Sequence, residues 1–124
     1  MSNEIVNHWI NGREYVSTSG RTAPVYDPAL GVETKRVALA NEVETKLAID
    51  SAHEAWPAWR DMSLAKRQAI IFKFRELLNA KKGELAEIIT SEHGKVLSDA
   101  LGEITRGQEV VEFATGIPHL LKGF

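Results

Sequence analysis

The sequence predicts an α+β chain, in which residues 5–40 form strands and turns and residues 41–120 form about four helices. Three observations support this prediction. Residues that favour strands alternate with turn signals up to about residue 40. From Asn41 onward the hydrophobic pattern changes to a helical period. No repeat, low-complexity stretch or long linker divides the 124 residues, which suit one domain or a portion of a larger one.

The N-terminal region contains a predicted hairpin and one further strand. The segment "IVNHWINGREYV" has two strand-like pieces around Asn11-Gly12, a dipeptide that favours the tight turn of a hairpin. The prolines and glycine of "APVYDPALG" predict a loop with only a short extended piece. Val37 and Leu39 fit a strand within "VETKRVALA".

Capping signals set the expected helix boundaries. Asn41 and Ser63 are suitable N-caps for the first two helices, and Pro57 is expected to end or kink the first. The second helix is expected to stop near Gly83, and a third to run over residues 84–93 with Gly94 as its left-handed C-terminal residue. The fourth is expected from about residue 98 toward residue 118.

Composition excludes several classes of function. The formal net charge of −2 gives no reason to expect nucleic acid or an anionic membrane as a partner. No stretch approaches the ~18 consecutive apolar residues of a membrane span, and the N-terminus lacks a secretory or transit pattern, so we expect a cytoplasmic location. Because cysteine is absent, this chain contains no disulfide, no thiolate zinc site and no cysteine nucleophile.

Most short motifs support structural interpretations. The glycines form neither a dinucleotide-binding fingerprint nor a Walker loop, no serine lies in a G-x-S-x-G turn, and the histidines are too scattered for a metal site. The charged groups of "SEHGK" could serve acid–base chemistry, but a helix end with a glycine cap is favoured. Trp56 and Trp59 could form a binding platform, although a place in the core is favoured.

The segment "GEITRGQEVVEF" is the exception. At about 100° per residue, a broad apolar face includes Ile104 and Val111, while Arg106 lies on a different side together with Val110 and Phe113. Apolar side chains on two sides indicate a helix buried between two layers, or between one layer and a cavity. A partly desolvated Arg106 would then require an anion.

An ordinary ion pair is the alternative role for Arg106, because Glu103 and Glu109 each lie three residues away. The pattern alone does not choose between these two roles. Gly102 and Gly107 each cost about 1 kcal/mol relative to alanine in a helix interior. This cost suggests that another backbone or a ligand approaches the helix closely.

Three long runs cover most of the sequence: "WINGREYVSTSGRTAPVYDPALG", "NEVETKLAIDSAHEAWPAW" and "RELLNAKKGELAEIITSEHGK". Through them, nearly the whole sequence resembles the N-terminal quarter of an aldehyde dehydrogenase. The more specific run "DALGEITRGQEVVEFATGIPHLLKG" is similar to the CoA-acylating methylmalonate-semialdehyde branch. One departure is "DPALG", where the family usually has Asn-Pro-Ala-Thr-Gly in a turn.

The resemblance implies a role for the complete enzyme and for one residue here. It implies a portion of an α/β Rossmann-like NAD-binding domain, in a homo-oligomeric enzyme of valine or inositol breakdown. That enzyme oxidises malonate or methylmalonate semialdehyde and, with NAD and CoA, yields acetyl- or propionyl-CoA. The catalytic cysteine and the NAD-contacting segments belong to later parts of the family's chain. Arg106 matches the arginine that pairs with the substrate carboxylate.

Two functional hypotheses therefore remain. In the first, the chain is the N-terminal segment of such a dehydrogenase, has no activity alone, binds neither NAD nor CoA alone, and has the remainder of the dehydrogenase as its partner. In the second, it is a stand-alone helical interaction module derived from an aldehyde dehydrogenase. The apolar ending "GIPHLLKGF" favours a chain that continues within a larger fold, although it could also dock on its own core.

Overall fold

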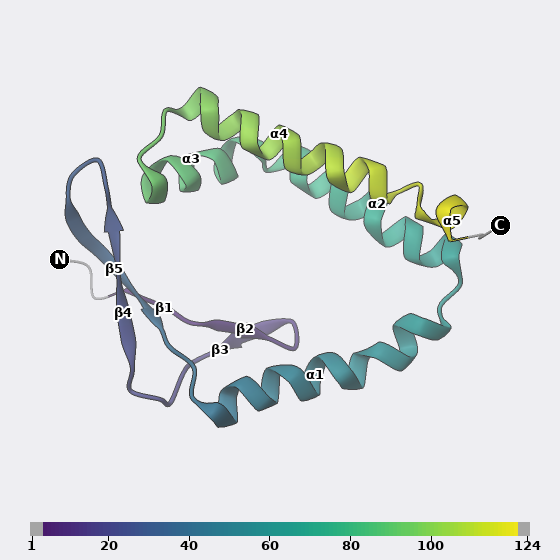
Figure 1. Cartoon of the computed structure of the whole chain (residues 1–124), viewed down its shortest axis with the longest axis horizontal. Coiled ribbons are helices and arrows are strands. Elements are labelled where there is room, and N and C mark those ends of the chain that lie inside the picture. Colours follow the sequence, from purple (N-terminus) through teal and green to yellow (C-terminus); the bar gives the residue numbers. More distant parts are fainter. Residues whose placement is uncertain (1–3, 122–124) are drawn as a thin grey trace. The chain divides into compact units, whose positions relative to one another are not determined.

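The computed structural model describes residues 4–121, which form two compact units that meet in the sequence between Arg60 and Asp61. The first unit contains five strands and nearly all of helix α1 (Glu42–Asp61), and the second contains the remaining helices (Figure 1). Strands therefore precede helices along the chain, which confirms the predicted α+β class.

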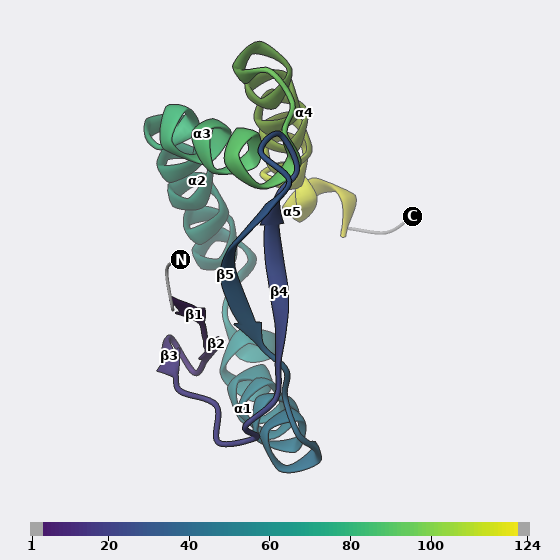
Figure 2. The ribbon, with the colours of Figure 1, turned by 90° about the vertical axis from the view of Figure 1, so that its left-hand side faces the viewer.

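Three strands of the first unit form one sheet in the order β1-β5-β4. Strand β1 (Ile5–Val6) is parallel to β5 (Val32–Ala38), and β4 (Thr22–Asp27) is antiparallel to β5. Figure 2 shows β4 and β5 as a long two-stranded ribbon. The predicted strand at β5 is thus confirmed.

Strand β4 is longer than the short extended piece expected from its sequence. Pro24 lies inside it, opposite Arg36 of β5. Because β4 pairs with only one described strand, Pro24 can lie where its missing N–H leaves no ladder bond unmade. The prolines therefore did not prevent a strand here.

The turn after β4 explains why the "DPALG" departure has little structural consequence. The Asp27 side chain accepts hydrogen bonds from the backbone N–H groups of Ala29 and Leu30, at 2.8 and 3.2 Å. Gly31 closes the turn with a φ of 69°, in the left-handed region that glycine adopts readily. Aspartate and asparagine both offer the side-chain oxygen that this turn uses.

The predicted hairpin forms between β2 (His8–Ile10) and β3 (Arg13–Tyr15). Asn11 and Gly12 have φ values of 52° and 72°. Two successive left-handed residues match the twist of a two-residue hairpin turn. Asn-Gly is thus the local cause of this hairpin.

Helix α1 differs from the sequence prediction at its C-terminal end. It was expected to end or kink at Pro57, and of these two alternatives the ending is wrong, because the helix continues through Pro57 to Asp61. The core assignment of the two tryptophans is also wrong for this chain, because Trp56 and Trp59 are 51% and 39% exposed. The Arg60 guanidinium lies over the Trp56 ring, 4.7 Å from its centroid, a cation–π contact.

The second unit is built from α2 (Leu64–Ala80), α3 (Lys82–His93), α4 (Leu97–Ala114) and the short α5 (Ile117–Leu120). Ser63 caps α2 as expected by accepting a hydrogen bond from the Lys66 N–H. Helix α3 begins at Lys82, two residues earlier than expected, and ends at His93. Gly94 follows with a φ of 80°, which confirms the left-handed cap.

Candidate functional site

Helix α4 is held in the second unit by polar contacts as well as by apolar packing. Helix α2 lies beside α4 and runs antiparallel to it (Figure 1), and polar groups of α4 pair with groups on α2 and on the start of α3. The pairs are Lys82 with Thr105 at 2.6 Å, Asn79 with Gln108 at 3.5 Å, Arg75 with Glu112 at 2.6 Å and Gln68 with the Thr115 carbonyl at 2.6 Å. These contacts fix which side of α4 is turned inward.

The packing face of α4 therefore includes polar side chains. Gln108 is buried, and Glu112 accepts two hydrogen bonds from Arg75. The Arg75 guanidinium is the main reason why the pKa of Glu112 is lowered. Ala100 on α4 and Ala86 on α3 are fully buried, since these two helices also pack on each other.

The opposite side of α4 presents what we call the Arg106 stripe: Gly102, Arg106, Val110 and Phe113. Spacings of three and four residues place these side chains on one face of a helical path. Arg106 is exposed, and Val110 and Phe113 are 69% and 71% exposed. The sequence prediction that Arg106 shares a side with Val110 and Phe113 agrees with this exposure, whereas the expected burial of that side is not found among residues 4–121, because no described segment covers it.

The guanidinium of Arg106 reaches back along the helix. Its Nη1 atom lies 3.8 Å from the position that a Cβ atom on Gly102 would occupy. Within residues 4–121, Arg106 makes no hydrogen bond and no ion pair. The alternative of an ion pair with Glu103 or Glu109 is therefore wrong for the described part of the chain.

Glu103 is bound by Lys95 instead. The Lys95 Nζ donates a hydrogen bond to Glu103 Oε1, from the connection between α3 and α4. This hydrogen bond is the main reason why the pKa of Glu103 is lowered, and the charge of Arg106 is the weakest of the contributing causes. "SEHGK" is thus a helix end, as favoured from sequence, but its lysine also binds the next helix.

The two glycines of α4 differ in their surroundings. A Cβ atom added to Gly107 would have no heavy atom within 4 Å apart from its own helix, whereas one at Gly102 would meet the Arg106 side chain. Among the described residues, no other backbone approaches either glycine that closely. The close approach inferred from sequence therefore stays a prediction about groups outside this structure.

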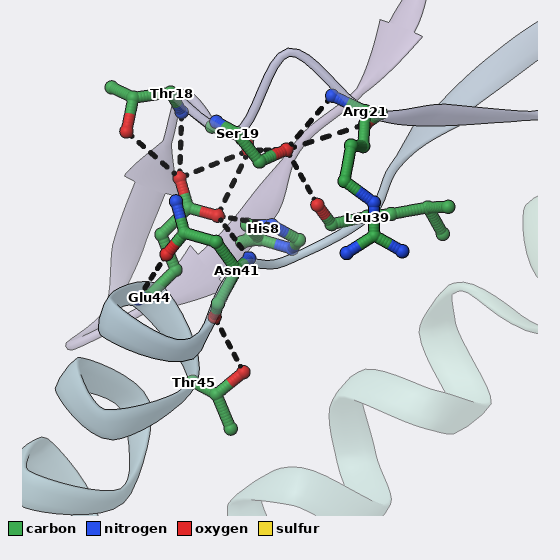
Figure 3. Close-up of polar contacts among 9 residues, drawn as sticks. His8, Thr18, Ser19, Arg21, Leu39, Asn41, Glu44 and Thr45 are labelled. Atoms are coloured by element: carbon green, nitrogen blue, oxygen red, sulfur yellow. Dashed lines mark hydrogen bonds and ion pairs between the residues drawn. The ribbon is translucent and has the colours of Figure 1, made fainter.

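A second cluster surrounds Glu44, which is only 2% exposed (Figure 3). Its carboxylate accepts hydrogen bonds from the Ser17 hydroxyl at 3.0 Å, the Thr18 N–H at 2.6 Å and the Asn41 N–H at 3.0 Å. The Asn41 contact is the largest cause of a lowered pKa for Glu44, and burial opposes it. The buried Nε2 of His8 lies 3.9 Å from the same carboxylate.

Sequence reasoning identified Asn41 as the cap but missed the role of Glu44. Asn41 Oδ1 accepts the Glu44 N–H at 2.9 Å while Glu44 accepts the Asn41 N–H, a reciprocal capping box. The Asn-x-x-Glu spacing is the signal that predicts it. The additional contacts with Ser17 and Thr18 fasten the loop after β3 to the start of α1, which is a structural role.

The start of α1 lacks the features of a nucleotide cradle. At the junction between β5 and α1, the Glu44 N–H donates to the Asn41 side chain and the Asn41 N–H donates to the Glu44 carboxylate, and no glycine-rich loop precedes this helix. A pyrophosphate normally uses such free N–H groups at a helix N-terminus. No helix within residues 4–121 is both long and apolar enough to cross a membrane.

Comparisons with known proteins agree with this architecture. Residues 15–123 match the aldehyde dehydrogenase family model. The chain is 42% identical over 118 residues to malonate-semialdehyde dehydrogenase from Pseudomonas aeruginosa, covering 95% of this chain and 24% of that protein.

Two solved structures give the same result. Methylmalonate-semialdehyde dehydrogenase from Oceanimonas doudoroffii superimposes with a TM-score of 0.93 at 40% identity, covering 98% of this chain and 25% of that one. A Sinorhizobium meliloti protein solved in complex with NAD gives a TM-score of 0.94 at 41% identity, with the same coverage. This chain spans about a quarter of the length of these relatives and aligns with them over nearly all of its own length, and it belongs to the aldehyde dehydrogenase family.

Proposed function

We propose that this chain is the N-terminal segment of an NAD-dependent, CoA-acylating dehydrogenase of malonate or methylmalonate semialdehyde. In the complete reaction the aldehyde carbon is oxidised while NAD accepts a hydride. The substrate carboxylate leaves as CO2, and CoA receives an acetyl or propionyl group. Within this chain, Arg106 binds the substrate carboxylate.

The observation that supports this proposal is the state of Arg106. Its guanidinium has no hydrogen-bonding partner within residues 4–121, although Glu103 and Glu109 are within helical reach. It is flanked along the stripe by exposed apolar side chains, which other parts of an enzyme could cover. An uncommitted arginine on a surface of this kind suits a small carboxylated molecule.

Arginine suits this task for a chemical reason. Its guanidinium stays charged at any physiological pH and can donate two parallel hydrogen bonds to one carboxylate. Lysine would offer a point charge without that fork. A semialdehyde bearing a carboxylate would therefore be oriented, with its aldehyde end directed away from Arg106.

The remaining chemistry is assigned to other parts of the enzyme. The chain contains no cysteine to attack the aldehyde, and the junction of β5 and α1 offers no phosphate cradle. We therefore expect the purified 124-residue chain to form no NADH from NAD, CoA and malonate semialdehyde. Measurable NADH formation at 340 nm, above a buffer control, would contradict this part of the proposal.

The Arg106 role is tested in the full-length dehydrogenase that contains this segment, or in the Pseudomonas aeruginosa relative with its matching quarter replaced by this chain. Arg106→Leu should lower the ratio of kcat/KM for malonate semialdehyde to kcat/KM for propanal by roughly 10- to 150-fold, the usual worth of a charge-assisted hydrogen bond. Arg106→Lys should lower this ratio by a smaller factor. Arg13→Leu, at an exposed position on β3, is the matched control and should leave the ratio near its original value. If Arg106→Leu lowered kcat/KM equally for both aldehydes, Arg106 would not bind the substrate carboxylate.

The stand-alone interaction module is the second candidate, and the exposed apolar stripe is the observation that favours it. The same side chains could bind a separate protein. Reading the gene beyond Phe124 distinguishes the two. A continuing frame with a cysteine and alternating strand and helix patterns supports the dehydrogenase segment, and a stop codon supports the module.

A further inference from the structure

Lys95 occupies an unusual place for a residue that follows a helix cap. Gly94 ends α3 in the left-handed conformation, and the next side chain turns toward α4 to bind Glu103. The Lys95 side chain is only 18% exposed, and that of Glu103 is 40% exposed. A lysine that serves only to solvate a helix end would extend into water.

The choice of partner matters because Glu103 has two cations within reach. Glu103 lies three residues before Arg106, a spacing at which side chains on a helix meet. A carboxylate at this distance would compete with a substrate carboxylate for the guanidinium. In the structure Glu103 is bound by Lys95 instead, and Arg106 makes no ion pair within residues 4–121.

Two other charged groups, His93 and Glu109, lie close in sequence to Glu103 and Arg106. The charge of His93 contributes to stabilising the Glu103 carboxylate, after the two contributions of Lys95. Glu109 is the other carboxylate three residues from Arg106, is exposed, and makes no ion pair in the described chain. Glu103 is therefore the carboxylate whose position is actively held.

We infer that Lys95 is a positioning residue that holds Glu103 away from Arg106 and so keeps the guanidinium available to an anionic substrate. This inference rests on the proposed function of Arg106. It assigns the lysine of "SEHGK" to substrate specificity, although Lys95 itself touches no substrate. Lys95 binds the Glu103 carboxylate, so that Arg106 remains free to bind the carboxylate of the substrate.

The expected effect follows from the population of free Arg106. An exposed ion pair of ordinary strength, formed between Glu103 and Arg106 once Lys95 is removed, would leave between one sixth and one half of the guanidinium free. Because apparent affinity falls with the fraction of competent protein, Lys95→Met should raise KM for malonate semialdehyde about two- to sixfold. The ratio of its KM to that of propanal should rise by the same factor.

The test is a set of variants of the full-length enzyme, all assayed with malonate semialdehyde and propanal. Lys95→Met should raise the KM ratio, Lys95→Arg should retain the original ratio, and Lys95→Met combined with Glu103→Gln should restore it. Restoration is the decisive readout, because the double variant still lacks the Lys95 contact and differs only in the freed carboxylate. Where Lys95→Met does not fold, Lys95→Gln replaces it, since glutamine removes the charge but keeps a polar end.

The outcomes separate this inference from the proposed function. If Arg106→Leu is selective for the carboxylated aldehyde but Lys95→Met leaves the KM ratio unchanged, the inference is overturned and the role of Arg106 stands. If Lys95→Met raises the ratio and Glu103→Gln does not restore it, Lys95 acts by shaping the α3–α4 connection, and the inference is again overturned. If Arg106→Leu is not selective, both fall together.

Discussion

Replacing Gly107 with alanine tests what the exposed side of α4 meets. Gly107 lies inside the 18-residue helix, and a Cβ atom there would have no heavy atom within 4 Å apart from its own helix. Without a steric penalty, the gain is the difference in helix propensity between glycine and alanine, about 1 kcal/mol. Gly107→Ala should therefore stabilise the 124-residue chain by about that amount.

The assay is urea unfolding followed by the helical circular dichroism signal. With a dependence on urea of roughly 1–3 kcal/mol per molar, the midpoint should rise by about 0.3–1 M. Gly102→Ala is a matched control in the same helix, because its Cβ would meet only the Arg106 side chain at an ordinary contact distance of 3.8 Å. It should raise the midpoint similarly. A lower midpoint for Gly107→Ala would refute the reasoning, since it would require a close neighbour within this chain.

The same substitution in the full-length enzyme tests the close approach inferred from sequence. If another part of the enzyme packs against Gly107, the added methyl group meets that neighbour, and the gain of about 1 kcal/mol should disappear or change sign. Equal stabilisation in the isolated chain and in the full-length enzyme would show that nothing approaches this glycine. The glycine would then be unexplained by packing.

Two further predictions concern the caps. Gly94→Ala should destabilise the chain by about 1–2 kcal/mol, because alanine is strained at a φ of 80°, and urea unfolding would show a lower midpoint with an unchanged slope. For Glu44, the folded-state pKa lies below the unfolded value, so its contribution to stability is present above the unfolded pKa and is lost as the pH falls through the folded one. Glu44→Gln should therefore weaken the acid dependence of the unfolding free energy below about pH 5. The control Glu42→Gln, at an exposed position, should preserve that dependence. Equal acid profiles for Glu44→Gln and the unaltered chain would contradict this role of Glu44.

Local features of the fold could be read from the sequence because they depend on neighbouring residues alone. Asn11-Gly12 sets the hairpin turn, Ser63 caps α2, and Gly94 ends α3, each through backbone geometry or a hydrogen bond within a few residues. The helical period also placed Arg106 on one side of α4 with Val110 and Phe113. These predictions needed no knowledge of what packs against the chain.

The predictions that failed depended on more distant partners. Pro24 lies in a strand because β4 pairs with β5 along its length. Helix α1 continues through Pro57 although proline removes one backbone hydrogen bond of the helix. Trp56 and Trp59 follow a core-like pattern, yet nothing among the described residues buries them fully. Hydrophobic spacing indicates which side of a helix prefers to be covered, but not which segment covers it.

The sequence by itself determined the α+β order, the main turns and caps, the family resemblance and the identity of Arg106 as the residue of interest. Only the tertiary structure decided which charges pair. Glu103 and Glu109 are equally spaced from Arg106 in the sequence, but the left-handed turn at Gly94 brings Lys95 to Glu103 and leaves the arginine uncommitted. Ion pairs across a turn depend on where the backbone directs each side chain, and helical spacing carries no information about a cation outside the helix.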